Sequence, residues 1–330
     1  MNIVVLYSLP TRRALASPYA DTEQDTVESA AEVARALIEK GATVTLLPVD
    51  EDHISRISDI RSDVVFNIID WTGLDSPLSD RALALVEQLH IPWTGATRAN
   101  YVMTSDKMTM KSSLVENGLP TARFQIFERG DESPRKDFQF PVIVKPALEH
   151  CSIGLTKDAI VPDAATLITR VQERIRTFHE SMVVEEFISG REFQVTAVEL
   201  PDGLRVLPPA EIVFDGNDAD SMLTYDSRWD DATVEYKTSH VALAVLSLPL
   251  LQTIEAVTKK TFADLSYRDY IRLDIRTRGA DIFILEANAN PGLSDDMEYG
   301  MTLSYKAAGW TFADFVWKIV ESTIRRSRQA

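Results

Sequence analysis

Arg272-Leu273-Asp274-Ile275-Arg276 is followed, after a short gap, by Ile282-Phe283-Ile284-Leu285-Glu286-Ala287-Asn288-Ala289-Asn290-Pro291-Gly292. Both runs are rich in Ile, Leu and Phe, and the turn residues Arg278-Gly279 between them predict two neighbouring antiparallel strands. Because side chains alternate across a strand, Arg272 and Asp274 share one face, and Glu286 and Asn288 share a face of the partner strand. We therefore expect four polar side chains to converge at one end of a hairpin.

These four side chains have the chemistry of a site for a hard cation. Two carboxylates and an amide oxygen form the all-oxygen set that Mg²⁺ prefers, and a sparsely held Mg²⁺ shares its remaining positions with water and substrate phosphates. An arginine beside such an ion is placed to neutralise charge that develops during group transfer. From the spacing alone, a strand pair with one solvated face explains the pattern equally well.

The pattern Arg-x-Asp, followed by Leu-Glu-Ala-Asn-x-x-Pro-Gly, resembles the metal-binding end of the ATP-grasp ligases, most closely the D-alanine:D-alanine ligase branch. The resemblance implies that Asp274, Glu286 and Asn288 hold one or two Mg²⁺ ions, for which Mn²⁺ can substitute, against the phosphates of ATP. It also implies that Arg272 and the backbone N–H of Gly292 stabilise the oxyanion of a tetrahedral intermediate. The implied fold is an α/β ATP-grasp fold with an N-terminal doubly wound domain.

Length and composition predict a globular protein with a reducing, cytoplasmic location. The chain has 330 residues, 45% of them hydrophobic, which is enough for two or three domains. Its 34 basic and 50 acidic residues give a formal charge of −16, which argues against nucleic acid or a membrane as a partner. The single cysteine, Cys151, excludes an internal disulfide, and the histidines lack the paired spacing of a zinc site. The apolar run at residues 3–7 lacks a basic leader, and the apolar stretch at 241–254 is too short to span a bilayer.

Strands and helices alternate over the first hundred residues. Apolar runs at 2–8, 43–49 and 64–69 predict strands, and amphipathic patterns before Gly41 and Ile91 predict helices. This order is typical of a parallel sheet, so residues 1–100 are expected to form a substrate-side α/β domain. No Gly-x-Gly-x-x-Gly follows the first strand, so a dinucleotide site is not supported. The resemblance divides the rest into a central ATP-grasp subdomain, residues 101–182, and a C-terminal subdomain, residues 183–330, with the metal and catalytic site.

Two lysines lie where phosphate contacts are expected. Lys107 falls in the first turn of a helix predicted for 105–116, where a lysine is ordinarily a solvated surface charge. Lys145 ends a strand predicted for 140–146, and the small-residue loop after it can offer N–H donors to phosphate oxygens. The resemblance implies that both lysines bind ATP phosphates, with Ser152 and Gly154 in the flexible loop. Cys151 has no identifiable His or Asp partner and is expected to be a small substituent rather than a nucleophile.

Two acids flank the turn at residues 189–191. Glu185 lies in a strand predicted for 182–187 and Glu192 follows seven residues later; by themselves they are ordinary strand-edge and turn acids. The resemblance implies that Glu185 faces the adenine amino group and that main-chain groups near Glu186 and Ile188 contact the ring edge. It assigns the ribose hydroxyls to Glu192, which can accept their protons.

The segment 215–236 is polar, rich in Asp and predicted to be a long loop. Its Tyr225 and Trp229 favour a lid over a disordered linker. The resembling ligases have a matching loop, usually with Lys where Arg228 stands, that reaches the transferred phosphate. Arg228 can make that contact with two donors. Beyond the hairpin, apolar periodicity at 301–308 and 311–325 predicts two helices.

The resemblance implies an ATP-dependent ligase that joins a carboxylate to an amine through an acyl phosphate and forms ADP. Lys107, Lys145 and Arg228 would align ATP, because phosphoryl transfer needs mainly positioning and charge neutralisation. The expected partners are small-molecule amino acids or amines, and a homodimer is left open. Two alternatives stay open: an ATP-grasp kinase or acyl-phosphate former with another acceptor, and an ATP-binding protein without catalysis.

We predict substrates other than a pair of D-alanines. The resembling ligases carry Gly-Gly-x-Ser-x-Glu after the first strand, whereas this chain continues with Leu9-Pro10-Thr11-Arg12-Arg13. Cys151 and Trp229 stand where the family has serine and tyrosine, and neither restores the same hydrogen bonds. The acids in Ser294-Asp295-Asp296-Met297-Glu298 favour a cationic or carboxylate-free second substrate. Arg12 and Arg13 are the candidates for contacting an acid group of a substrate.

Overall fold

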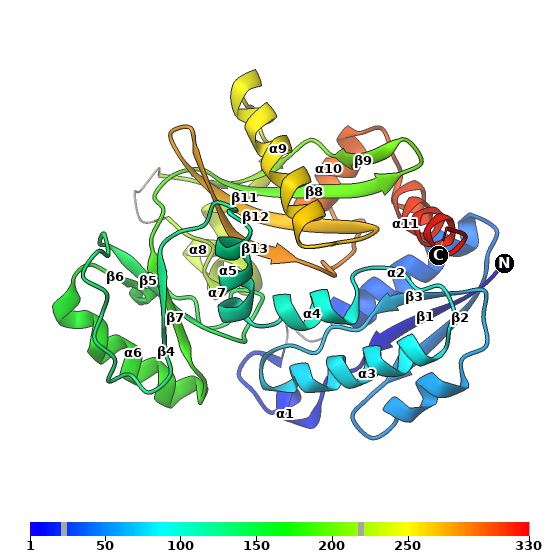
Figure 1. Cartoon of the computed structure of the whole chain (residues 1–330), viewed down its shortest axis with the longest axis horizontal. Helices are drawn as coiled ribbons and strands as arrows, with labels where there is room; N and C mark the ends of the chain where they lie inside the picture. Colours follow the sequence, from blue (N-terminus) through cyan, green and yellow to red (C-terminus); the bar gives the residue numbers. More distant parts are fainter. Residues whose placement is uncertain (21–24, 217–220, 330) are drawn as a thin grey trace.

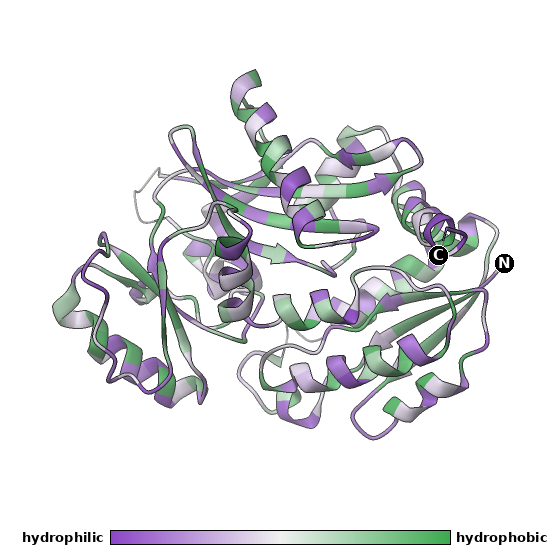
Figure 2. Ribbon diagram, viewed as in Figure 1, coloured by the Kyte–Doolittle hydropathy of each residue, from purple (hydrophilic) through white to green (hydrophobic). Residues whose placement is uncertain are grey.

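Three β-sheets organise this protein. The computed structural model describes residues 1–20, 25–216 and 221–329 (Figure 1). The first sheet comes from the N-terminal part of the chain, the second from the middle, and the third contains the hairpin of the C-terminal part. Apolar residues line the faces where helices meet the sheets, while hydrophilic residues dominate the outer faces of the helices (Figure 2).

The first sheet is parallel, in the order β2-β1-β3. Its strands are β1 (Asn2–Ser8), β2 (Thr43–Val49) and β3 (Val64–Ile68). Ile3 and Val5 belong to the same core as α2 (Asp25–Glu39), while Val4 and Leu6 belong to that of α3 (Ser76–Gln88). The two cores follow from strict alternation along β1, and they confirm the doubly wound arrangement predicted for this region.

The second sheet is antiparallel, in the order β4-β7-β5-β6. Its strands are β4 (Phe124–Phe127), β5 (Val142–Pro146), β6 (Ile160–Val161) and β7 (Met182–Glu186). The helix α6 (Ala164–Phe178) packs on it and shares its core. Asp163 starts α6 by accepting the backbone N–H groups of Ala165 and Thr166, and the helix ends at left-handed His179.

The third sheet follows the order β11-β10-β8-β12-β13, with β9 also paired to β8. Its strands are β8 (Glu192–Leu200), β9 (Gly203–Val206), β10 (Ala210–Phe214), β11 (Ser239–Leu243), β12 (Tyr270–Arg278) and β13 (Asp281–Asn288). One face packs on α5 (Lys107–Glu116) and α9 (Leu248–Asp264). The other packs on α10 (Gly300–Ala307) and α11 (Phe312–Ser327).

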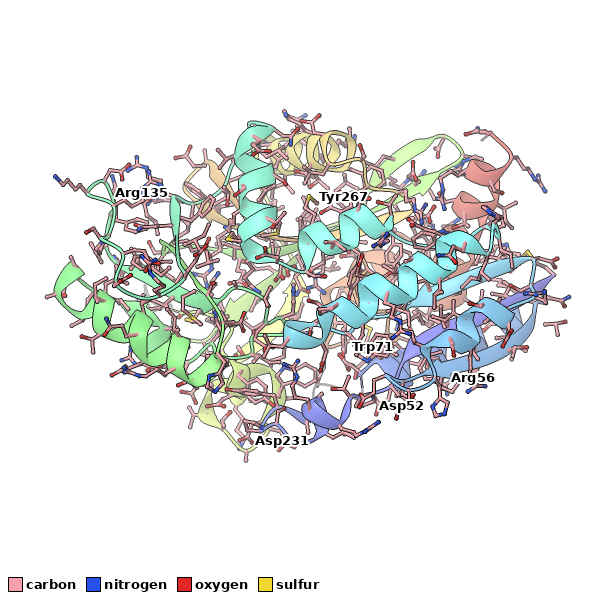
Figure 3. All side chains as sticks on the ribbon, turned by 60° about the horizontal axis from the view of Figure 1, so that its bottom comes forward. Asp52, Arg56, Trp71, Arg135, Asp231 and Tyr267 are labelled. Atoms are coloured by element: carbon pink, nitrogen blue, oxygen red, sulfur yellow. The ribbon has the colours of Figure 1, made fainter. Side chains whose placement is uncertain are left out.

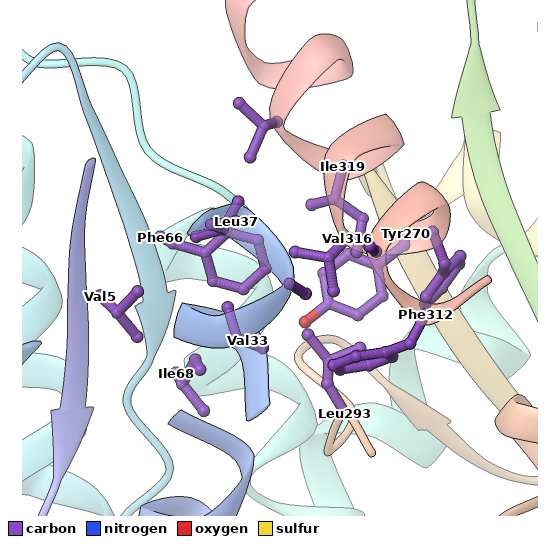
Figure 4. Close-up of a cluster of buried hydrophobic side chains, with 14 of the residues drawn as sticks. Val5, Val33, Leu37, Phe66, Ile68, Tyr270, Leu293, Phe312, Val316 and Ile319 are labelled. Carbon is purple, nitrogen blue, oxygen red and sulfur yellow. The ribbon is translucent and has the colours of Figure 1, made fainter. Parts of the chain in front are cut away.

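The first and third sheets share one core through the C-terminal helix. Val316 and Ile319 of α11 lie in the same cluster as Val33 of α2, Phe66 of β3 and Tyr270 of β12 (Figure 4). Thr311 and Asp314 form a capping box that starts α11. The N-terminal unit is therefore fixed against the sheet that carries the hairpin.

The predicted loop at residues 215–236 is wrong in part. It contains two short helices, α7 (Tyr225–Trp229) and α8 (Val234–Lys237), each begun by a threonine that accepts a backbone N–H. Residues 217–220 of that segment lie outside the described residues. In a segment so rich in Asp, the capping role of Thr224 and Thr233 was not distinguishable from ordinary loop polarity.

The remaining helices are short. They are α1 (Arg12–Leu15) and α4 (Arg98–Thr104), with 3₁₀ turns at Ile54–Asp59, Gly73–Asp75 and Lys157–Ala159. The strand β7 crosses the boundary proposed between residues 182 and 183, so we propose that the division falls after Glu186. Trp71 packs in the interior beside α3, whereas Arg135 and Asp231 extend from the periphery (Figure 3). Within the described ranges, no helix is long and apolar enough to cross a membrane.

The shared core gives a stability prediction. Ile319→Ala should lower the free energy of unfolding by about 2–5 kcal/mol, because Ile319 is fully buried and its loss leaves a cavity. Ile38→Ala on α2 is the matched control, since Ile38 is 57% exposed. Chemical denaturation followed by fluorescence measures both. Equal effects of the two substitutions would contradict a core shared through α11.

Candidate active site

A cavity lies where residues from all three sheets meet, and the β12–β13 hairpin forms one of its walls. Its lining includes Lys107 at the start of α5, Lys145 of β5, Glu185 of β7 and the hairpin residues Arg272 and Glu286. The other predicted site residues also line it: Ser152, Glu186, Ile188, Glu192, Arg228, Asp274, Asn288 and Gly292. Gly154 lies in the same loop as Ser152 but is not part of the lining. The structure therefore brings together residues that are up to 185 positions apart in the sequence.

The hairpin contains a β-bulge that the sequence did not reveal. Asp274 pairs with Glu286 and Ile275 pairs with Ile284, which leaves Leu285 as an extra residue. Ile284 belongs to the core on the face of α5 and α9, so strict alternation would bury Glu286 on that face too. The extra residue reverses the alternation and puts Glu286 and Asn288 on the cavity side, with Arg272 and Asp274.

Three of the four polar groups at the hairpin end contact one another, and the fourth, Glu286, contacts His150. Arg272 donates two hydrogen bonds to the carboxylate of Asp274, at 2.8 and 2.9 Å, and Asn288 Nδ2 donates to Asp274 Oδ2 at 3.1 Å. Burial raises the pKa of Asp274, and Arg272 only partly opposes this effect. Burial would also raise the pKa of Glu286, but Lys107, His150 and Arg272 hold it well below its usual value. Two facing carboxylates and an amide are a donor set that fits a hard cation.

His150 is a member of this cluster that the sequence reasoning missed. Its Nδ1 lies 2.7 Å from Glu286 Oε1 and its Nε2 lies 3.3 Å from the carbonyl oxygen of Ser105. His150 belongs to the loop after β5, so its contact with β13 depends on how the second sheet is placed against the third. Sequence spacing carries no signal of such a contact.

Three charges, one carboxylate and two ammonium groups, meet beside the cavity. The Glu185 carboxylate contacts Lys145, which lines the cavity, and also Lys111, which is 1% exposed. Burial acts to raise the pKa of Glu185, yet Lys111 and Lys145 outweigh it and lower that pKa to about 2. Lys111 lies one helical turn after Lys107, and the sequence offered no reason to separate it from surface lysines.

The acid expected at the ribose is already engaged by an arginine. Arg276 of β12 donates to Glu192 Oε2 at 2.8 Å and to the carbonyl oxygen of Ile188 at 2.9 Å. Glu186 accepts the backbone N–H of Gln139 at 2.9 Å. Arg276 thus ties the start of β8 to the segment after β7, and it orders the side of the cavity where base and sugar contacts were predicted.

The loop of residues 147–154 follows the cavity wall. A Cβ on Gly154 would lie 2.6 Å from the ring of Phe178, and its φ is +75°, so only glycine fits there. Trp229 of α7 donates its indole N–H to the carbonyl oxygen of Cys151 at 3.0 Å. The predicted lid segment therefore touches the loop directly. Arg228, next to Trp229, lines the same cavity.

The predicted substrate contacts of Arg12 and Arg13 are wrong. Arg12 pairs with Glu51 and Asp52 at the outer surface, and Arg13 pairs with Asp75 at 3.0 Å. Neither arginine lines the cavity. Both sit just beyond β1 in α1, whose short helix directs them to neighbouring surface acids.

Two carboxylates of the N-terminal unit occupy the place that was assigned to those arginines. Asp25 begins α2 and accepts a hydrogen bond from the Tyr299 hydroxyl at 2.8 Å, and Asp70 follows β3 and accepts one from Tyr101 at 3.0 Å. Both line the cavity, and neither has an ion-pair partner among the described residues. Burial raises the pKa of Asp70. The N-terminal unit thus contributes acidic rather than basic side chains to the cavity.

With this geometry in place, comparisons with known proteins identify the family. The model of a family described as "D-ala D-ala ligase C-terminus" matches residues 114–321. The chain belongs to this family. It is similar to an uncharacterized protein, y4sG, of Sinorhizobium fredii, with 32% identity over 74% of this chain and 69% of the relative. It is also similar to a D-alanine–D-alanine ligase of Erythrobacter litoralis, with 27% identity over 93% of this chain and 91% of the relative.

Solved structures of family members share the fold. A D-alanine–D-alanine ligase from Bacillus anthracis, complexed with ATP, matches with a TM-score of 0.74 and 18% identity, covering 100% of this chain and 99% of that one. The VanG D-Ala:D-Ser ligase from Enterococcus faecalis matches with a TM-score of 0.75 and 15% identity, covering 98% and 99%. The ATP-grasp fold predicted from the sequence is confirmed. At these identities the likeness concerns the fold alone.

The thiol of Cys151 provides a test of the site's burial. Burial raises the pKa of Cys151 to about 11, so the thiol stays protonated at neutral pH. Iodoacetamide at pH 8 should alkylate it on the order of 100-fold more slowly than an unperturbed thiol, because only the thiolate reacts. The rate should rise with pH up to that pKa. Since the chain has one cysteine, mass spectrometry reads the site directly, and the urea-unfolded chain is the control. A rate that titrates near pH 8.5 in the folded protein would contradict this assignment.

Proposed function

We propose that this protein is an ATP-dependent carboxylate–amine ligase that forms an amide bond through an acyl phosphate and releases ADP. The observation that carries the proposal is the convergence of Arg272, Asp274, Glu286 and Asn288 on a cavity that also receives Lys107 and Lys145. Family membership supports the ligase class. The cytoplasmic location expected from the composition belongs to the same proposal.

The hairpin end is proposed to hold Mg²⁺ through Asp274, Glu286 and Asn288. Bound there, the ion would neutralise charge on the ATP phosphates. The two facing carboxylates support this assignment, because a cation between them would offset the burial, and to a lesser extent the repulsion by Glu286, that raises the pKa of Asp274. Lys107 and Lys145 would also contact phosphate oxygens, and the loop with Ser152 and Gly154 would cover them.

The nucleotide base and sugar are proposed to bind between the second and third sheets. The Glu185 carboxylate would accept a hydrogen bond from the adenine amino group, and main-chain groups at Glu186 and Ile188 would contact the ring edge. The Glu192 carboxylate would accept hydrogen bonds from the ribose hydroxyls, and Arg276 would hold that carboxylate in place. All five of these residues line the cavity, which supports the assignment of the base and sugar contacts.

The reaction is proposed to proceed in two steps. A substrate carboxylate oxygen attacks the γ-phosphorus of ATP, and the bond to ADP breaks. The nitrogen of the amine then attacks the acyl carbon, loses a proton, and displaces inorganic phosphate. Arg272 and the Gly292 amide would stabilise the oxyanion between these events, while Arg228 would contact the transferred phosphate. The contact of Trp229 with the loop at Cys151 supports a lid that keeps water from the acyl phosphate.

Two rival functions remain distinguishable by experiment. A kinase or acyl-phosphate former would release ADP with a carboxylate or hydroxyl acceptor and need no amine. A non-catalytic ATP-binding protein would release no ADP with any acceptor. The ligase proposal requires that sustained ADP release depend on both a carboxylate and an amine.

The acid pair at the hairpin end should be essential for turnover but not for folding. Glu286→Gln and Asp274→Asn are each expected to lower ADP release by at least about 100-fold, because the lost charge would serve the metal in the transition state. Asp281→Asn, at the far, exposed end of β13, is the matched control. Thermal unfolding of each variant checks the fold. Wild-type rates in both acid variants at saturating Mg²⁺ would overturn the metal assignment.

The first substrate is proposed to present an ammonium group to Asp25 and Asp70, and to be something other than D-alanine. Asp296 and Glu298 line a neighbouring pocket that shares Gly292 with the cavity, which supports a cationic or carboxylate-free second substrate. A charge-assisted hydrogen bond contributes about 1.5–3 kcal/mol, so Asp25→Asn should raise the KM of the first substrate roughly ten- to hundred-fold.

Phosphate release across D- and L-amino acids, diamino acids and amines, singly and in pairs, tests this substrate assignment. Mass spectrometry identifies the product. If D-alanine alone gives the highest rate and D-alanyl-D-alanine is the product, the substrate assignment is wrong while the ligase proposal stands. An unchanged KM in Asp25→Asn would remove Asp25 from the ammonium site.

A further inference from the structure

Lys111 is the most deeply buried cation near the cavity. Its side chain is 2% exposed, as is that of Glu185, whereas the side chain of Lys145 is 13% exposed. Lys111 does not line the cavity, so it cannot be one of the groups that meet ATP directly. An ammonium removed from water in this way is costly unless it is paired and hydrogen-bonded. Its contacts therefore indicate what it is for.

Lys111 joins the two sheets that enclose the cavity. Besides Glu185 of β7, its ammonium donates to Thr121 Oγ1 at 2.7 Å and to the carbonyl oxygen of Ile284 at 3.2 Å. Thr121 donates to the same Ile284 oxygen at 2.8 Å. Ile284 directly precedes the bulge residue Leu285 and lies two positions before Glu286. The buried ammonium of Lys111 thus connects Glu185, the carboxylate expected at adenine, with the β-bulge that directs Glu286 into the cavity.

The charges around Glu185 do not balance in pairs. One carboxylate faces two lysines, so a single positive charge is in excess, and Lys145 is the partner with access to the cavity. When Lys145 turns toward a phosphate, Glu185 still has Lys111 as a partner. Without Lys111, the buried Glu185 and Lys145 would form a closed pair, and moving Lys145 away would leave an uncompensated carboxylate.

We propose that Lys111 is a positioning residue that acts as the permanent counter-ion of Glu185 and thereby leaves Lys145 free to bind the nucleotide phosphates. This inference rests on the proposed ATP site. Lys111 acts through Glu185 and Lys145 and touches neither substrate nor reacting atoms. Its bonds to Thr121 and Ile284 fix its position relative to the bulge, so the counter-ion stays in place while Lys145 moves.

The test measures nucleotide binding separately from turnover. Isothermal titration calorimetry gives the ATP Kd for wild type, Lys111→Met and Lys111→Arg, and steady-state assays give KM and kcat. Lys111→Met, which keeps most of the length of the side chain but removes its charge, should weaken ATP binding at least tenfold. KM should change more than kcat, and Lys111→Arg should recover part of the loss. Lys260→Met, an exposed lysine on α9, is the matched control and should leave the Kd unchanged.

A double-mutant cycle separates positioning from a merely structural role. In a Glu185→Gln background no carboxylate holds Lys145, so adding Lys111→Met should cost at most about twofold in ATP affinity. A structural role would give the same loss in both backgrounds, and that result would overturn the proposal. The double variant also lacks the unpaired buried charge, which keeps the test valid if Lys111→Met alone folds poorly.

The two proposals fail in different ways. Unchanged ATP affinity in Lys111→Met overturns the role of Lys111, whatever reaction the protein catalyses. ATP binding that shows the predicted cycle, without ADP release for any carboxylate and amine, overturns the ligase function and supports the role of Lys111. Absence of ATP binding by the wild-type protein overturns both.

Discussion

The bulge at Leu285 is the constraint on which the site depends. Side chains of β13 alternate between a packed core and the cavity, and Ile282 and Ile284 take the core positions before the bulge. A regular strand would continue with Glu286 and Asn288 in that core, where two polar side chains would lose their hydration. The extra residue exchanges the faces, so the core receives Ala287 and Ala289 instead. The strand thus buries its small apolar residues, while Glu286 and Asn288 face the cavity.

The N-terminal unit is held against this hairpin by contacts that involve few residues. Asn290, just after β13, accepts a hydrogen bond from the Tyr270 hydroxyl at 3.1 Å and donates to the carbonyl oxygen of Ile69 at 3.3 Å. Tyr270 also packs in the core shared with α11. The end of β3, where Asp70 lies, is therefore tied to the segment that leads to Gly292. Packing in the core shared through α11 thus fixes the position of Asp70 relative to the hairpin end.

The sequence allowed the hairpin, the parallel N-terminal sheet and the two cavity lysines to be predicted, because each depends on local periodicity or on a motif. The bulge was not predictable from alternation, since strict alternation places Ile284 and Glu286 on the same face of one strand. His150 and Lys111 could not be found, because their partners lie in other sheets. The helix α6 was missed although Asp163 caps it, since many acids of this chain occupy ordinary surface positions.

The cavity holds two aspartates without an ion-pair partner among the described residues, together with several cations, and under the proposed function these cations would let an acidic protein bind anionic groups. Asp25 and Asp70 belong to the N-terminal unit, while Lys107, Lys145, Arg228 and Arg272 come from later parts of the chain. A zwitterion between them would direct its ammonium to the aspartates and its carboxylate to the arginines and the γ-phosphate. Glu185 pairs with Lys145, and Asp274 pairs with Arg272, so the charge of these two cations is neutralised in part before any ligand binds. The charge that remains is then set by which of these pairs opens, and Lys111 makes the pair of Glu185 with Lys145 the one that opens at least cost.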